Sequence, residues 1–130
     1  MTLAREITLP AEAAASIDQI LGIVLDSFMG GHDTVAGRGA YGWRFDIERV
    51  VELEQRLRDV WTPEELSRGS GDERVLVLDI EDVALVLQGM AFTEVMSAEL
   101  PWVDMVRWTS DFVTAQLRPY WTDQEWAAVG

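Results

Sequence analysis

The sequence predicts a single, mostly helical α+β domain over residues 1–130, with four to five helices and a small two-stranded β-ribbon. Apolar residues recur at helical spacing through several long segments, and two short segments have strand-like patterns. Hydrophobic residues make up 48% of the chain, and a chain of this length can bury roughly two-thirds of its unfolded surface. An all-α bundle is the alternative if the two short segments are not strands.

The first element is a strand followed directly by a helix. Residues 5–9 alternate polar and apolar side chains and stop at Pro10, which is typical of a short strand. Pro10 suits the first turn of a helix, and apolar positions within 17–28 recur at helical spacing. The pair Gly30-Gly31 is expected to end this helix, because glycine tolerates the positive φ of a C-terminal cap.

A second helix is predicted over residues 46–61, with Asp46 as its N-cap. A short turn follows, capped by Thr62 and with Pro63 at its first position. Residues 75–78 are apolar, partly β-branched and bounded by turn residues, so they predict a second strand. Its simplest partner is the first strand, which gives the two-stranded ribbon.

The remaining segments predict two long helices and a last short one. Asp79 can cap a helix over 81–97, which is apolar on nearly all sides and is therefore expected at the centre of the fold. A further helix is predicted over 101–118. Residues 122–125 form a capping-box pattern for a final turn that carries Trp126.

Charge restricts the classes of partner. The ten basic residues are all arginine, and the 23 acidic residues leave a net charge of −13. Nucleic acids and anionic membrane surfaces are disfavoured, because both need clustered positive charge on the protein. A basic protein would instead be attracted, and its association rate would rise at low salt. Solubility alone is the plainer explanation of the same charge.

Three residue types are missing from the chain, namely lysine, asparagine and cysteine. A bacterial genome of high GC content explains the loss of lysine and asparagine, and a halophilic source is the second explanation. Without cysteine there is no disulfide, thiolate metal site or cysteine nucleophile. We expect a cytoplasmic protein, since the N-terminus has no signal-peptide pattern and no apolar run is long enough to cross a bilayer.

A glycine-rich connection over residues 30–45 is the least regular segment. Residues 37–42 spell G-x-G-x-x-G, but no strand precedes them and no helix starts at the third glycine, so nucleotide binding is disfavoured. The only histidine, His32, lies beside Asp33, and this pair is the single candidate for general base catalysis. A structural histidine at a helix end is the favoured alternative. The candidate ligand-binding residues of this segment are Arg38, Tyr41 and Arg44.

Metal and hydrolase chemistry find little support. One histidine and no cysteine exclude the zinc sites built from several such ligands. Asp79, Glu81 and Asp82 lie close together and could hold a hard cation, but acids are expected in the first turn of any helix. We therefore expect no metal and no cofactor. No serine lies in a Gly-x-Ser-x-Gly pattern.

Six tryptophans are many for this length. Trp61 and Trp102 lie on the apolar stripes of their helices and are expected in the core. Trp108, Trp121 and Trp126 are expected to form an apolar patch, used either for self-association or for a partner. The alternative is that the C-terminal segment folds back and buries them.

Three functional hypotheses follow. The first is a non-enzymatic acidic module that docks on a basic protein surface, as immunity proteins, antitoxins and host-defence inhibitors do. The second is an enzyme or small-molecule binder that uses the glycine-rich segment. The third is a homo-oligomeric structural component, such as a dimer, joined through the tryptophan-bearing C-terminus. The candidate partner-binding residues are Asp46, Glu48, Glu52, Asp59, Glu64, Glu65, Trp108, Trp121, Asp123, Glu125 and Trp126.

Overall fold

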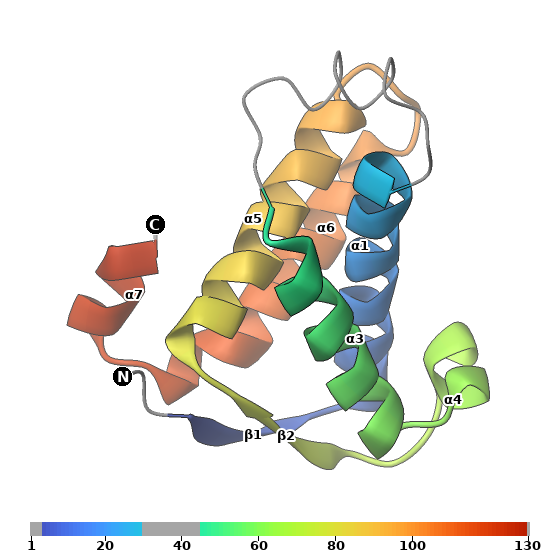
Figure 1. The fold of residues 1–130 in the computed structure, drawn as a ribbon. Helices are drawn as coiled ribbons and strands as arrows, with labels where there is room; N and C mark the ends of the chain where they lie inside the picture. The colour runs from blue at the N-terminus through green and yellow to red at the C-terminus, as the bar shows by residue number, and fades with distance from the viewer. Residues whose placement is uncertain (1–3, 30–44, 130) are drawn as a thin grey trace.

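Four long helices stand on one face of a two-stranded ribbon (Figure 1) in the computed structural model, which describes residues 4–29 and 45–129. The long helices are α1 (Ala11–Met29), α3 (Ile47–Val60), α5 (Ile80–Met96) and α6 (Val103–Leu117). The strands are β1 (Arg5–Leu9) and β2 (Arg74–Leu78), and the short elements are α4 (Pro63–Arg68), η1 (Arg118–Tyr120) and α7 (Asp123–Val129).

This arrangement confirms the predicted mostly helical α+β fold. The described residues form six α-helices where the sequence predicted four to five, because the turns expected after Thr62 and Thr122 each extend into a short helix. Helix α6 starts at Val103 rather than at Pro101, since the residues before it form a turn in which the Val103 N–H donates to the Leu100 carbonyl at 3.2 Å.

Side-chain caps fix where most helices begin. The Asp46 carboxylate accepts the Arg49 backbone N–H at 3.3 Å at the start of α3, as predicted. Thr62 and Glu65 form a complete capping box at α4, and Asp79 and Asp82 form one at α5. Such caps satisfy N–H groups that the helix itself leaves unpaired, so they place the helix start at a defined residue.

The ribbon is antiparallel, with Ile7 opposite Leu76. Alternate side chains face the helices and are buried, whereas Val75 and Val77 point outward and are each 45% exposed. Strand pairing was predicted from these same residue patterns, and the structure confirms it. The inward side chains make the ribbon the floor of the hydrophobic core.

Each outer edge of the ribbon is occupied in part by a side chain. On β1, the Tyr120 hydroxyl accepts the Thr8 N–H at 3.2 Å and donates to the Thr8 carbonyl at 3.3 Å. On β2, the Arg56 guanidinium donates to the Val77 carbonyl at 3.0 Å. Unpaired strand edges attract further strands, so these side chains make edge-to-edge association unfavourable.

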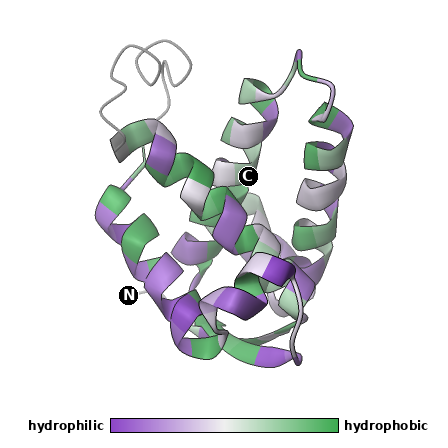
Figure 2. Ribbon diagram, turned by 90° about the vertical axis from the view of Figure 1, so that its right-hand side faces the viewer, coloured by the Kyte–Doolittle hydropathy of each residue, from purple (hydrophilic) through white to green (hydrophobic). Residues whose placement is uncertain are grey.

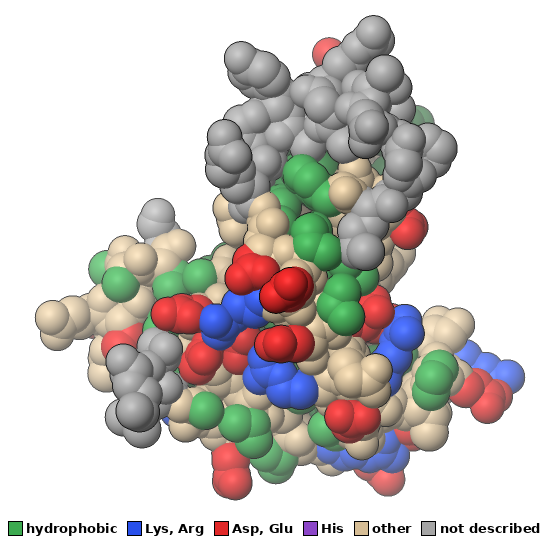
Figure 3. Space-filling model, in the orientation of Figure 1, with side chains coloured by type: hydrophobic (Ala, Val, Ile, Leu, Met, Phe, Trp, Pro, Cys, Tyr) green, Lys and Arg blue, Asp and Glu red, His purple; other side chains and the backbone are tan. Residues whose placement is uncertain are grey.

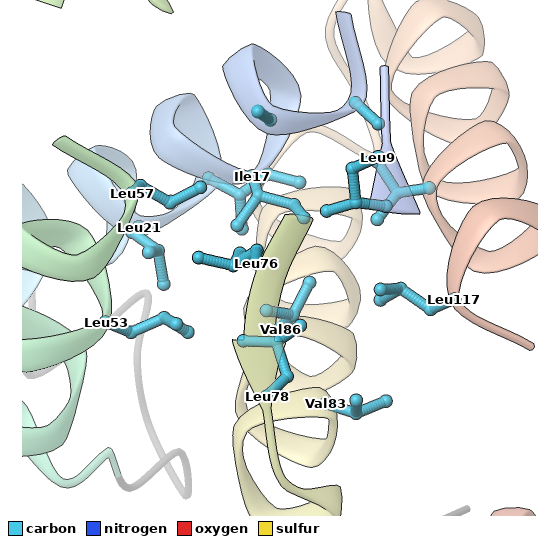
Figure 4. Close-up of a cluster of buried hydrophobic side chains, with 14 of the residues drawn as sticks. Leu9, Ile17, Leu21, Leu53, Leu57, Leu76, Leu78, Val83, Val86 and Leu117 are labelled. Carbon is cyan, nitrogen blue, oxygen red and sulfur yellow. The ribbon is translucent and has the colours of Figure 1, made fainter. Parts of the chain in front are cut away.

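The core forms where the four long helices meet the ribbon (Figure 4). Leucine, isoleucine and valine side chains from every one of these elements converge there. The labelled members are Leu9, Ile17, Leu21, Leu53, Leu57, Leu76, Leu78, Val83, Val86 and Leu117. Helix α5 is central, as predicted, because it packs on α1, α6, α7 and β2.

Helices α1 and α5 approach closely at Gly89. A Cβ atom added at Gly89 would lie 2.9 Å from Ile20 Cγ2 and 3.5 Å from Val24 Cγ2. The first distance is shorter than carbon atoms tolerate, so glycine is needed here by the spacing of the two helices. The Thr93 hydroxyl donates to the Gly89 carbonyl at 2.8 Å on the same buried face of α5.

The first strand and the last helix are joined by a bidentate ion pair. The two terminal guanidinium nitrogens of Arg5 donate to the two Glu125 carboxylate oxygens at 2.7 Å, and the guanidinium carbon lies 4.6 Å from the centre of the Trp121 ring. Hydrogen bonds from Arg5 and from the Thr122 backbone lower the pKa of Glu125 to about 2. The Thr122 capping box predicted for this helix is present, with Glu125 as its acidic member.

Candidate functional site

The predicted glycine-rich site cannot be placed in the fold. His32, Asp33, Arg38, Tyr41 and Arg44 all lie outside the described residues. The general base pair and the anion-binding arginines therefore stay predictions from the sequence.

The three acids considered for a cation bind an arginine instead. Arg49 contacts Asp79 and Glu81 at 2.7 Å each and Asp82 at 3.1 Å, and Arg56 contacts Asp82 at 2.9 Å. Burial of Asp82 acts to raise its pKa, but hydrogen bonds from Arg56 and from the Asp79 backbone outweigh it, so the pKa lies below its usual value. Among the described residues, no group of three or more acids or histidines is arranged to hold a metal ion.

Every arginine in the described part of the chain forms a salt bridge. Many acidic residues of that part form no salt bridge. All of its arginines therefore have an acidic partner within the fold, and the excess negative charge stays uncompensated. The acids without a salt bridge among the described residues are Glu6, Glu12, Asp26, Asp46, Glu48, Glu52, Asp59, Asp72, Glu73, Glu99 and Asp111.

The predicted acidic contact residues separate into two groups. Asp46, Glu48, Glu52 and Asp59 are exposed along α3, and none of them forms a salt bridge in the described part. The other four are engaged within the fold, in the pairs Glu64–Arg68, Glu65–Arg74, Asp123–Arg118 and Glu125–Arg5. Red and blue side chains lie next to each other on the face that carries α3 (Figure 3), so charge alone does not define one docking site there.

The predicted tryptophan patch is wrong as an exposed surface. Trp121 is only 5% exposed and lies under Arg5. Trp126 is half-buried, with Arg118 5.3 Å from its ring centre. Trp108 is 65% exposed on α6, where it stacks on Phe112 at 5.5 Å. The C-terminal segment thus buries Trp121 and half-buries Trp126 but leaves Trp108 exposed, so neither the patch of three tryptophans nor their complete burial matches the structure.

The prediction that Trp102 lies in the core was also wrong. It was expected in the core, whereas it is 53% exposed, and Met105 on the same helix is 69% exposed. Trp61 is buried as predicted, and its indole N–H donates to the Asp72 carbonyl at 3.1 Å. The exposed side chains of α6 therefore define a surface that the helical pattern did not identify.

These side chains border an apolar groove of about 360 Å³ between α1, α5 and α6. Figure 2 shows the side of the molecule on which the α5–α6 hairpin spreads away from the end of α1. The groove is lined mainly by Ile20 and Ile23 of α1, Met90 of α5, and Trp102, Met105 and Val106 at α6. Aromatic and methionine side chains are enriched at the centres of protein interfaces, and methionine adapts readily to different partners.

Few polar groups enter the groove. Those of the described lining are Gln19, Thr93, Ser97 and Thr109, and the Thr93 hydroxyl is already bonded to the Gly89 carbonyl. None of the described lining residues is titratable near neutral pH, so the groove offers no general acid or base. The described lining suits the burial of apolar groups.

The sequence prediction missed the groove because it placed Trp102 in the core. Val106 lies seven positions before Val113 and eleven before Leu117, so the groove residues of α6 lie on the same side of the helix as these buried residues, nearer its start. Helical spacing carries no signal that separates the two groups, because it does not say which turns of one side a neighbouring element covers.

A scan against protein-family models finds no match, and comparisons with curated proteins and with solved structures find none either. Among the described helices, none combines the length and the hydropathy needed to cross a bilayer.

Proposed function

We propose that this protein is a non-enzymatic, acidic binding module that docks on a basic protein. The observation that carries the proposal is the apolar groove between α1, α5 and α6, which is lined in part by the exposed side chains of Trp102 and Met105. Exposed apolar patches of this kind mark interaction sites, because leaving them in water is unfavourable.

Charge selects the kind of partner. The chain carries −13, and the arginines of the described part are all engaged within the fold. A basic protein would therefore be steered toward the molecule over distances of about 10 Å at ordinary salt. The unpaired acids of α3 (Asp46, Glu48, Glu52 and Asp59) add to this field, and the groove supplies the short-range contact. Because the chain has no cysteine, the module needs no disulfide, which suits a reducing cytoplasm.

The test compares two substitutions that add the same charge at different surfaces. Met105→Glu places a carboxylate at the groove, and Val51→Glu places one on α3, where Val51 is 44% exposed. Immobilised wild-type protein and both variants are incubated with a lysate of the source cells, and the retained proteins are identified and eluted by a salt gradient. We expect basic proteins on the wild type and on Val51→Glu, released by salt, and their loss on Met105→Glu.

Three results would overturn the proposal. The first is retention of a partner that Met105→Glu leaves unchanged, because the groove would then not be the docking site. The second is an absence of basic proteins among those retained at low salt. A homo-oligomer, measured by sedimentation and disrupted by Met105→Glu, would assign the same surface to a second copy and replace the proposal by the structural-component hypothesis.

A further inference from the structure

The groove has the shape of a helix-binding channel. Its lining comes from one turn of α1 (Gln19 to Ile23), two turns of α5 (Met90 to Ser97) and two turns of α6 (Trp102 to Thr109). At 1.5 Å of rise per residue, the stretches on α5 and α6 run for roughly 10 Å. The apolar floor therefore extends along the helix axes instead of forming a closed pocket.

We propose that the occupant is an amphipathic helix of the partner, with apolar anchors at i, i+3 and i+7 and with arginine or lysine flanking them. This inference rests on the proposed function and names the part of the basic partner that enters the groove. Peptide helices that bind in this mode lay one apolar face into a groove of about this length. The new helix would pack against α1 and α6 over the floor formed by α5.

The apolar surface continues outside the cavity, which favours a helix over a small molecule. Trp102 and Met105 of the lining are 53% and 69% exposed, and Leu100 in the α5–α6 connection is 39% exposed. A small ligand that filled the cavity would leave these side chains in water. A helix lying along the groove would cover them with its flanking turns.

The polar surroundings argue against an extended peptide. A peptide strand binds through backbone hydrogen bonds to a free sheet edge. Tyr120 and Arg56 each occupy part of one ribbon edge, and the walls of the groove are helices, whose backbone groups are bonded internally. The occupant must therefore satisfy its own backbone hydrogen bonds, as a helix does.

The acids around the groove favour a basic flank and disfavour a second copy of this chain. Asp26 lies one turn beyond Ile23 on α1, and Glu99 lies in the α5–α6 connection; neither forms a salt bridge among the described residues. Glu94 and Asp104 share the single cation Arg107. A second copy would bring another −13 to this surface, whereas arginine or lysine at the ends of a helix would meet these carboxylates.

The test uses synthetic peptides as probes. The principal peptide has about fourteen residues, with blocked ends, leucine at i, i+3 and i+7, arginine at both ends, and alanine and glutamine elsewhere. The matched controls are a peptide of the same composition whose leucines do not share one face, a peptide with a central proline, and a peptide with glutamate in place of arginine. Binding is measured by fluorescence anisotropy and helicity by circular dichroism.

We expect the principal peptide to become helical on binding and the three controls to bind at least about tenfold more weakly. Met105→Glu should reduce its affinity by a similar factor, and Val51→Glu should leave it unchanged. Asp26→Asn with Glu99→Gln should weaken the arginine peptide several-fold and reduce the salt dependence of its binding. Circular dichroism of each variant confirms that the fold is intact.

The outcomes separate this inference from the proposed function. Equal binding of the scrambled or proline peptide overturns the helical occupant, while loss of basic proteins from the Met105→Glu column would still support the docking module. Failure of the principal peptide to bind, or its equal binding to Met105→Glu, also overturns the inference. A dimer that the same variant dissociates overturns both.

Discussion

Replacement of Gly89 by alanine gives the sharpest test of how α1 and α5 pack beneath the groove. In most helix interiors this change stabilises a protein by about 0.5–1 kcal/mol, because alanine restricts the unfolded chain. Here the new Cβ would lie 2.9 Å from Ile20 Cγ2. The Ile20 side chain or one of the two helices must then shift, and overpacking of this kind costs about 1–3 kcal/mol. We expect Gly89→Ala to lower the free energy of unfolding by about 0.5–2 kcal/mol.

Gly22 provides the matched control. It lies inside α1, and a Cβ added there meets nothing within 4 Å. Gly22→Ala should therefore stabilise the protein by the full propensity gain of about 0.5–1 kcal/mol. The two glycine-to-alanine changes are chemically identical, so their opposite signs would isolate the close approach of the helices.

A double-mutant cycle assigns the cost to one contact. Ile20 is 6% exposed, so Ile20→Ala alone should cost about 2–5 kcal/mol, but it removes the Cγ2 atom that the new methyl group would meet. In that background Gly89→Ala should become stabilising, giving a favourable coupling energy of about 1–3 kcal/mol. Urea unfolding followed by far-UV circular dichroism measures all four proteins. If Gly89→Ala and Gly22→Ala stabilise the wild type equally, the described packing of α1 on α5 is wrong.

Three further predictions concern pH, the buried ion pairs and the tryptophans. The folded-state pKa of Glu125 is lowered from 4.5 to about 2, so the contribution of this carboxylate to stability is complete above pH 4.5 and is lost as the pH falls toward 2. The difference in unfolding free energy between wild type and Glu125→Gln should therefore shrink over that pH range. A difference that does not change with pH would contradict the pairing of Glu125 with Arg5. Asp82→Asn should lower the free energy of unfolding in urea by about 2–3 kcal/mol, because it weakens a buried partner of two arginines. Glu81 pairs with Arg49 as well, but its side chain is 60% exposed, so Glu81→Gln should cost less than about 0.5 kcal/mol. Equal costs would show that burial of the carboxylate is not decisive. Trp108→Phe should remove a fluorescence component that acrylamide quenches readily, and Trp61→Phe should remove a protected one, since their exposed fractions are 65% and 1%; the reverse order would contradict the placement of α6.

The element boundaries could be predicted because their causes are local. Asp46, Thr62 and Asp79 cap their helices through bonds to residues three positions along the chain, and such patterns can be recognised without tertiary information. The strand pairing could also be predicted, because only two segments had the composition of a strand. Helix and strand identity were therefore correct over the described residues.

The groove could not be predicted because the spacing of apolar residues describes each helix by itself. It identifies the residues that share a side, but whether a neighbour covers that side depends on packing between distant elements. Trp102 looked like a core residue for this reason. The ion pairs of Arg49 could not be predicted for the same reason, because its acidic partners lie thirty or more positions away in the sequence, at Asp79, Glu81 and Asp82.

The complete engagement of the described arginines has a consequence for how dissolved salt acts on this molecule. Carboxylates that lack a counter-charge repel one another, and mobile ions relieve that repulsion. The surface ion pairs lose little in exchange, because pairs of this kind contribute at most about 1 kcal/mol each. High ionic strength should therefore raise the stability of the folded chain and lower its affinity for any cationic partner. The salt concentrations that best preserve the fold are then those at which the protein binds most weakly.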